Sequence, residues 1–578
     1  MKTAQTTGNR SIFLSLAGMI QKLCQKIENI PGKVPELVAC ITYAVPHILM
    51  GFVHEPWYDE AIAWQIARCA PIKELLFEIP HYEGHPPLWH LILAPFAKLG
   101  APYELSLCII SLIFAGAACG LIIYKSPFPR IIRLLLPFTY FFFYQYGVIS
   151  RPYCVMMLVF VLLAMAYQNR NTKPGIYVAL LMLLCLTSAF GILLAGGLAI
   201  VWILEMWNCQ NVFTFIKKML RDKRTLWLLA LLIFALILIA GIMPREDTFA
   251  TSNMSTYNTK KALLNSLLYM LLAWPAEVSM TNIYTNYELL QTLDIPWSSR
   301  IVAYLIGLTI WIILIAWAKH RKTCSLLVIP FVLYAVVASV LYMSPHHIGI
   351  GLCFLVFWFW VSLNEQVKGR FLENMSLQTR SVISSAIVIL GSVSMIISLS
   401  WNITSSFQDI FYSYSSGRNE AKYIKENGLD NYRIMVGWNV SYDEDGEVSE
   451  MDINNYVQAD NIAPYFDRNI LFNFNNGDDT LNYTTHKKAD DKQTEETLLR
   501  WKEQRPDVLY MYPDIGLIYE DINLSEYKLV FYQRNYKWWK GFPNHSESKI
   551  YVHDDLIEEL NLETYNNETY AWMSLYGN

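Results

Sequence analysis

Charged residues are scarce in this chain, and cysteine is missing from its last third. Only 16% of the 578 residues are charged, whereas 54% are hydrophobic. Soluble domains carry about a quarter charged residues, so this composition excludes an ordinary soluble protein and favours many membrane spans. The ten cysteines lie between Cys24 and Cys353, and no Cys-x-x-Cys spacing occurs. We therefore expect buried packing cysteines rather than a thiolate metal site.

The first 35 residues do not resemble a signal peptide. Their one apolar stretch, residues 12–20, is short, and no small-residue cleavage site follows it cleanly. Lys22, Lys26 and Lys33 accompany it. Residues 1–35 are therefore predicted to be an amphipathic, cytoplasmic N-terminal segment.

The charges are divided unequally along the chain. Residues 404–578 hold 31 Asp and Glu against 16 Lys and Arg, which leaves 18 acidic and 29 basic residues before them. Residues 36–403 are thus predicted to form a net basic membrane module, and residues 404–578 a soluble acidic domain. Such acidity argues against binding of nucleic acid.

The apolar runs predict about eleven spanning helices, most of them close to the roughly 20 residues that a bilayer requires. The fold class expected is therefore a polytopic α-helical membrane protein. The spans fall at residues 36–53, 104–124, 131–149, 152–168, 174–188, 190–208, 225–243, 300–318, 324–343, 347–364 and 380–401.

The apolar stretch 86–99 is too short to span and suits an interfacial or re-entrant helix. Excluding it places the loops rich in Lys and Arg on one side, which the positive-inside rule makes cytoplasmic. We therefore expect a multi-pass protein of the cell membrane. Its N-terminus is cytoplasmic, its outer loops include 54–103 and 244–299, and its C-terminal domain is extracytoplasmic.

The soluble domain alternates helix-like and strand-like segments. Helix-like residues 418–427 precede an apolar strand at 433–438, and strand-like segments 527–532 and 549–553 close the chain. This alternation predicts an α/β domain with a partly parallel sheet.

The unusual polar residues of the membrane module named below all fall at its predicted outer face. Ionisable groups at a membrane are costly, and one-sided convergence suits an active site, whereas a transporter more often places such groups near the midplane. The set is Asp59, Glu60, His81, Glu83, His85, His90, Arg151, His346 and His347.

Asp59 and Glu60 follow the first span directly. Adjacent residues on a helix point about 100° apart, so the two carboxylates should have different tasks. One can face a reaction centre while the other caps the helix or binds a cation. The alternative is that both merely cap an interfacial helix that runs to about Arg68.

Glu83 and His85 precede the pair Pro86-Pro87. Carboxylate and imidazole groups can hold a divalent cation, magnesium, manganese or zinc, and Glu83 is the predicted ligand. Each histidine could instead be an interfacial hydrogen-bonded ring. Arg151 could bind a phosphate in bidentate fashion or extend to lipid headgroups, and His346 and His347 could act similarly.

These motifs resemble a family of membrane enzymes. Tyr58-Asp59-Glu60-Ala61, followed by Glu83-Gly84-His85-Pro86-Pro87-Leu88, is similar to the GT-C superfamily of glycosyltransferases. The similarity points to the branch of protein O-mannosyltransferases and aminoarabinose transferases, and it covers roughly residues 36–401. The interval between Glu83 and the prolines is one residue longer here.

The resemblance implies an enzyme that moves a sugar from a polyprenyl-phosphate donor to an acceptor (protein, lipid or glycan) at the outer face. It implies Asp59 as the general base with Glu60 as its supporting partner, and Glu83 as a metal ligand. His85, Arg151, His346 and His347 are candidates for phosphate binding from their position alone. The alternatives are a transporter or flippase of lipid-linked sugars and a non-catalytic membrane assembly protein.

Overall fold

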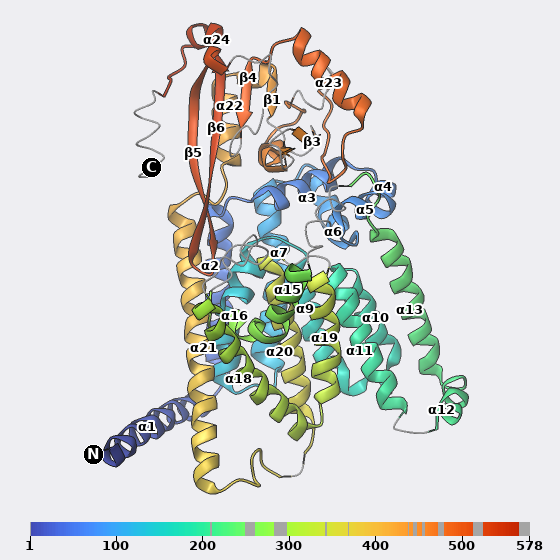
Figure 1. Ribbon diagram of the computed structural model, residues 1–578, viewed down its shortest axis with the longest axis vertical. Helices are drawn as coiled ribbons and strands as arrows, with labels where there is room; N and C mark the ends of the chain where they lie inside the picture. The colour runs from blue at the N-terminus through green and yellow to red at the C-terminus, as the bar shows by residue number, and fades with distance from the viewer. Residues whose placement is uncertain are drawn as a thin grey trace.

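The molecule consists of a helical bundle topped by a small domain that contains a β-sheet (Figure 1). The computed structural model describes residues 2–207, 211–248, 260–282, 297–340, 344–367, 369–436, 439–442, 448–452, 457–471, 479–511 and 524–565. Elements are labelled as in Figure 1.

Seven helices of the described chain are long and apolar enough to cross a membrane. They are α2 (Val34–Val53), α7 (Tyr103–Lys125), α11 (Ala189–Trp207), α13 (Lys223–Ile242), α18 (Trp297–Arg321), α20 (Ile348–Asn364) with the turn η5 (Pro345–His347) before it, and α21 (Leu377–Phe411). Three shorter apolar helices overlap further predicted spans, namely α9 (Tyr153–Ala166), α10 (Pro174–Cys185) and α19 (Cys324–Val340). The class of a helical protein suited to a membrane is thus supported, and the count of eleven spans stays a prediction.

The predicted span 131–149 is not one helix. It is divided into α8 (Arg130–Leu135), the 3-10 turn η1 (Leu136–Phe138) and the π-helix η2 (Phe141–Val148). Pro137 supplies no backbone N–H, and Thr139 after it is extended with ψ 155°, so the helix ends there and restarts. All residues of η2 are buried.

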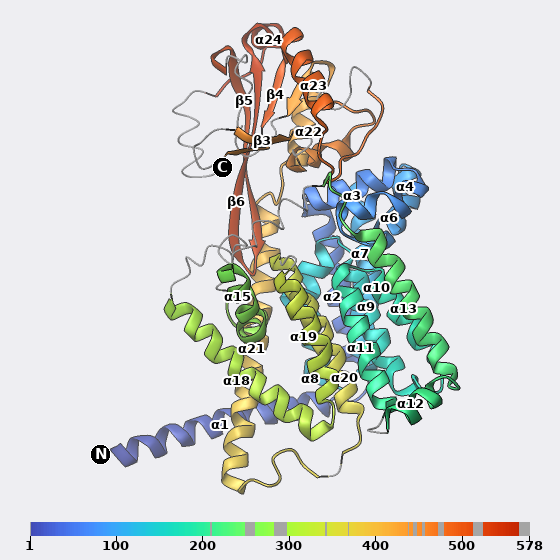
Figure 2. The ribbon, with the colours of Figure 1, turned by 45° about the vertical axis from the view of Figure 1, so that its right-hand side comes forward.

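Four short helices cover the end of the bundle that carries the C-terminal domain (Figure 2). The first begins directly after the predicted first span and ends close to Arg68, as expected. The last is 11 residues long, which agrees with the interfacial helix predicted for 86–99. They are α3 (Tyr58–Cys69), α4 (Ile72–Phe77), α5 (Ile79–Glu83) and α6 (Leu88–Lys98).

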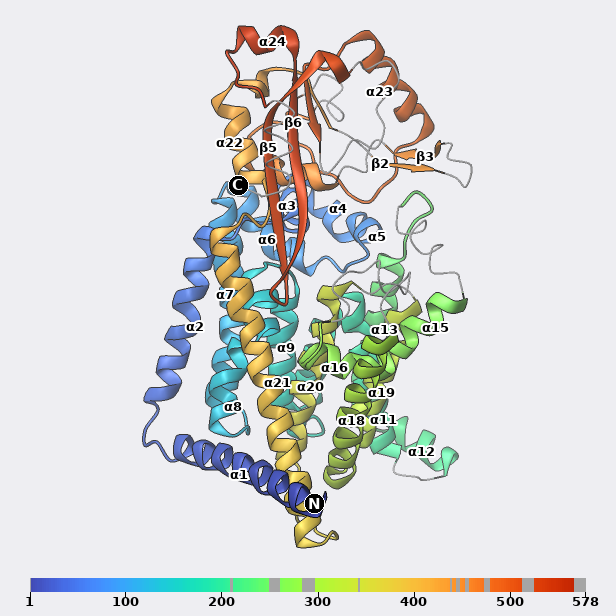
Figure 3. The same ribbon diagram turned by 60° about the vertical axis from the view of Figure 1, so that its left-hand side comes forward.

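The opposite end of the bundle carries two further helices. The N-terminal helix α1 (Lys2–Glu28) runs across the lower end of α21 (Figure 3). The basic helix α12 (Val212–Met219) lies at this same end (Figure 2). The bundle therefore separates a basic end from the end with Asp59 and Glu83.

The predicted outer loop 244–299 contains a helical segment that the sequence did not predict, and its second half is buried. α15 (Lys260–Leu268) leads into the π-helix η4 (Tyr269–Ala273) and α16 (Trp274–Ser279), and the segment packs on α18, α19 and α20. Trp274 and Glu277 are fully buried. Residues 249–259 and 283–296 of this loop lie outside the described part.

The C-terminal domain is built on a four-stranded sheet in the order β1-β4-β6-β5. β1 (Ile434–Val436) and β4 (Val508–Met511) are parallel, and β6 (Phe542–His553) is antiparallel to both β4 and β5 (Tyr527–Trp539). This confirms the predicted partly parallel sheet. Ile434, Val508 and Ile550 form its core with Ile424 of α22 (Gly417–Glu426). The domain also contains the 3-10 helix η7 (Val457–Tyr465) and helices α23 (Asp491–Glu503) and α24 (Asp554–Glu559).

Strands β5 and β6 are much longer than predicted and form a hairpin that reaches down to the helical bundle (Figures 1 and 3). Its turn consists of Lys540 and Gly541, which have φ of 49° and 80°. Positive φ at both central residues is the mark of the tight turns that match strand twist. The turn thereby places its side chains among residues of the membrane module.

Candidate functional site

Glu60 is committed to structure at the start of α3. Its Oε2 accepts from the backbone N–H of Trp57 (3.2 Å) and closes the first turn of the helix. Its Oε1 accepts from the N–H of Ser150 (2.6 Å), so the carboxylate joins the first outer segment to the turn before α9. The side chain is only 1% exposed. Glu60 therefore positions the residues beside it and does not face solvent.

His54 ties Glu60 to the end of α21. Its Nδ1 lies 2.7 Å from Oδ2 of Asp409, and its Nε2 lies 3.4 Å from Oε2 of Glu60. Burial alone would lower the pKa of His54, but the two carboxylates outweigh it and raise this pKa to about 10. A charged imidazolium thus holds the ends of α2 and α21 to the start of α3.

Asp59, on the next face of α3, forms an ion pair with Arg151. The two side chains are 18% and 14% exposed, so both can reach a ligand. Arg151 lies in the short turn between η2 and α9. The structure therefore joins two residues that were predicted separately, a carboxylate and a guanidinium from different outer segments.

Glu83 pairs with a histidine of the C-terminal domain. Its Oε1 lies 3.2 Å from Nδ1 of His486. Burial raises the pKa of Glu83, but the charge and the hydrogen bond of His486 lower it by more. The pKa of Glu83 is therefore about 2. His85 and His90 lie close by, and burial lowers the pKa of each to about 4. At neutral pH the two are therefore uncharged rings beside an ionised Glu83.

A metal at Glu83 stays a prediction. Among the residues that the structure describes, no group of three or more His, Cys, Asp or Glu side chains is arranged to hold a metal ion. Glu83 instead has His486 as its charged partner.

The adjacent histidines before α20 differ in role. His347 is 2% exposed, its Nδ1 accepts from the N–H of Ser344 (3.0 Å), and its carbonyl accepts from Tyr334 (2.9 Å). It shapes the start of α20. The His346 ring lies 6.5 Å from that of Trp57, the residue before α3, so His346 is the member that borders the Asp59 site.

Lys537 of β5 reaches the same site, and the sequence analysis missed it. Its Nζ lies 4.3 Å from the ring centroid of Trp57 and 4.8 Å from that of Tyr58. Burial lowers the pKa of Lys537 to about 8, and Asp59 opposes this shift. An aromatic run with two lysines at residues 536–540, inside an acidic domain, was the available signal for contact with the membrane module.

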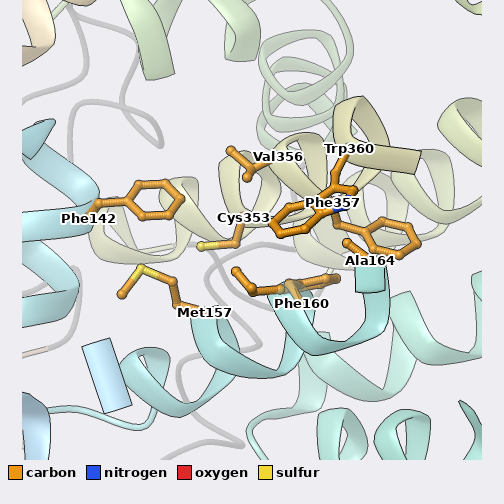
Figure 4. Close-up of a pocket in the computed structure, with 9 residues that line it drawn as sticks. Phe142, Met157, Phe160, Ala164, Cys353, Val356, Phe357 and Trp360 are labelled. Atoms are coloured by element: carbon orange, nitrogen blue, oxygen red, sulfur yellow. The ribbon is translucent and has the colours of Figure 1, made fainter. Parts of the chain in front are cut away.

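We refer to Asp59, Arg151, Lys537, Glu83 and His486 as the charged cluster. It is distinct from an apolar pocket between η2, α9 and α20 (Figure 4). That pocket is lined by aromatic and aliphatic side chains and the Cys353 thiol, and no charged side chain lines it. The charged cluster instead brings acidic and basic side chains together at the end of the bundle that carries the C-terminal domain.

Searches against protein-family models, curated proteins and solved structures find no match for this chain.

Proposed function

We propose that the protein is an integral membrane glycosyltransferase of the GT-C type. It would transfer a sugar from a polyprenyl-phosphate donor to an acceptor at the end of the bundle that carries the C-terminal domain. The observation that carries this proposal is the accessible Asp59–Arg151 pair at the rim of an apolar helical bundle. A donor of this kind keeps its tail in the bilayer and presents its phosphate and sugar at this rim.

The pair contains the two charges that such a transfer requires. Asp59 takes the proton from the acceptor hydroxyl as its oxygen bonds to the anomeric carbon. The bond from that carbon to the phosphate oxygen breaks, and its electron pair remains on the phosphate, where Arg151 stabilises the added charge. A phosphate bound to Arg151 also competes with Asp59 for the guanidinium, so donor binding frees the base.

Glu60 has a supporting role in this proposal. Its bonds to Trp57 and Ser150 fix the first turn of α3 against the turn that carries Arg151. This is consistent with the predicted partnership of the two carboxylates, with Asp59 as the reacting one.

The test is transfer by purified protein from a panel of labelled polyprenyl-phosphate sugars, with Asp59→Asn beside the wild type. Asp467→Asn is the matched control, because Asp467 is a fully exposed carboxylate that pairs with Arg68 of α3, the helix that also carries Asp59. We expect product with the wild type and the control and none with Asp59→Asn. Near-normal turnover of Asp59→Asn, or no product from any donor, would refute the proposal.

A further inference from the structure

The placement of Lys537 follows from strand alternation along β5. Successive side chains of a strand point to opposite faces. Tyr536 and Trp538 contact Tyr412 at the end of α21, with ring centroids 5.2 and 5.7 Å apart. Trp539 contacts Tyr140 on the other face (5.6 Å), and Lys537 shares that face. The hairpin therefore directs Lys537 toward the start of α3, where Asp59 lies, and toward η2, which leads into the turn with Arg151.

The hairpin is held in this position by its tip. Nζ of Lys540 donates to Oε1 of Glu277 (2.7 Å) and to the carbonyl of Thr281 (3.0 Å). Gly541 N–H donates to Oγ of Ser405 in α21 (2.8 Å). Lys537 lies three residues before this anchor. Its position at the site is thus a consequence of fixed tertiary contacts.

Asp59 has two cationic neighbours. Arg151 forms the ion pair with Asp59, and Asp59 is also the charged group that acts on Lys537. The guanidinium comes from the turn before α9 and the ammonium from β5, so the two cations approach the carboxylate from different segments. A phosphate that takes the place of the Asp59 carboxylate beside Arg151 would therefore also lie close to Lys537.

We propose that Lys537 of the C-terminal domain, together with Arg151, binds the phosphate of the lipid donor. This inference rests on the proposed function and adds a residue from the C-terminal domain to the same site. As the sugar leaves, the phosphate gains a second negative charge, and the Lys537 ammonium is placed to stabilise it. Trp57 and Tyr58 hold the ammonium by cation–π contact until the phosphate arrives. The C-terminal domain is then part of the active site.

The direct test is binding of polyprenyl monophosphate, the leaving group, to the full-length protein in phosphatidylcholine nanodiscs. Charge-assisted hydrogen bonds are among the stronger ones in proteins, so we expect Lys537→Met to weaken binding about 10- to 100-fold. Lys537→Arg should stay within about threefold. Lys528→Met is the matched control on the same strand, because Lys528 is half-exposed and pairs with Asp554. Unchanged affinity in Lys537→Met would overturn the proposal.

A measurement on the wild type covers the case in which Lys537→Met does not fold. Reductive methylation of lysines, followed by mass spectrometry, reports the access of reagent to each amine. We expect polyprenyl monophosphate to slow the modification of Lys537 and to leave Lys528 unaffected. Equal modification of Lys537 with and without the ligand would contradict the inference.

Two further arms identify the source of the phosphate. Polyprenol without phosphate should bind wild type and Lys537→Met equally weakly, and phosphatidic acid should compete poorly. Competition by phosphatidic acid equal to that of polyprenyl monophosphate would assign the site to lipid headgroups and overturn the donor assignment.

The outcome separates this inference from the proposed function. Asp59→Asn should lose transfer but retain phosphate binding that depends on Lys537. If no donor supports transfer while that binding persists, the transferase proposal fails and the phosphate site stands. If transfer requires Asp59 but phosphate binding does not depend on Lys537, the transferase proposal stands and the phosphate site at Lys537 fails.

Discussion

Two ion pairs near the β5–β6 hairpin, Lys540–Glu277 and Asp59–Arg151, differ in burial and in the role that this burial permits. Lys540–Glu277 at the hairpin tip is 0% exposed on both sides, and the ammonium also donates to the carbonyls of Glu277 and Thr281. Asp59–Arg151 is accessible and lies beside a second cation, Lys537. An ion pair that is fully buried and whose donors are all hydrogen-bonded can hold segments together, but it cannot reach a ligand. An accessible pair that lies beside a second cation can exchange its partner for a ligand.

The largest expected effect separates the two pairs by activity. Asp59→Asn should lower the rate of transfer about 10²- to 10⁴-fold, because the side chain can no longer accept the acceptor proton. Its free energy of unfolding should fall by less than that of Lys540→Met, because Asp59 and Arg151 are 18% and 14% exposed whereas Lys540 and Glu277 are 0% exposed. Rates from labelled donor and thermal unfolding in detergent measure the two quantities. A variant that is inactive because it unfolds would break the comparison.

Lys540→Met should show the converse behaviour. It removes the ammonium that forms an ion pair with the buried Glu277 carboxylate, which costs about 3–5 kcal/mol of stability. Changing both residues, in Lys540→Met/Glu277→Leu, should recover most of that loss, because an apolar pair of similar volume also removes the buried carboxylate. Thermal unfolding of the two variants provides the measurement. Equal destabilisation of the single and double variants would show that the ion pair is not what anchors the tip.

His54→Gln sharpens the assignment of Glu60 to structure. It removes the cation between Asp409 and Glu60, and we expect a loss of about 3 kcal/mol near pH 6. Because the pKa of His54 is raised from 6.5 to about 10, its stabilisation is fully present below pH 6.5 and disappears as pH rises through 10. Unfolding midpoints of wild type should therefore fall toward alkaline pH, and those of His54→Gln should fall less. Parallel pH profiles of the two proteins would contradict this.

The smallest expected effect is a pH dependence of phosphate binding. Burial lowers the pKa of Lys537 to about 8, so the ammonium is lost as pH rises from 7 to 9, and affinity for polyprenyl monophosphate should fall several-fold. The groups facing Lys537 are Asp59 and the Trp57 and Tyr58 rings. Lys537→Arg keeps its charge throughout this range, so its affinity should remain flat. A decline of equal size in Lys537→Arg would assign the titration to another group.

The sequence predicted best what depends on local composition. The helix within 86–99 could be predicted because its apolar run is too short to span a bilayer. The helical segment at 260–279 could not, because its apolar residues are interrupted by Lys, Asn and Glu. Those polar residues include the buried Glu277, whose ion-pair partner Lys540 comes from the end of the chain.

The candidate site shows the same limit. Asp59, Arg151, Glu83 and His346 could be named individually, since charge at the mouth of a span is conspicuous. Their partners could not, because His486 lies 403 residues after Glu83 and Lys537 lies 480 residues after Trp57. Strand alternation shows which face Lys537 occupies only after the length of the hairpin is known.

The contact between Lys540 and Glu277 also sets an order of events during synthesis. Glu277 enters the bundle 263 residues before its partner is made. We therefore expect the growing protein to bury this carboxylate without the Lys540 ammonium until its closing strands emerge, and a product cut short before residue 540 to be recognised as defective. Pulse-chase comparison of full-length and shortened products tests this, and equal lifetimes would exclude it.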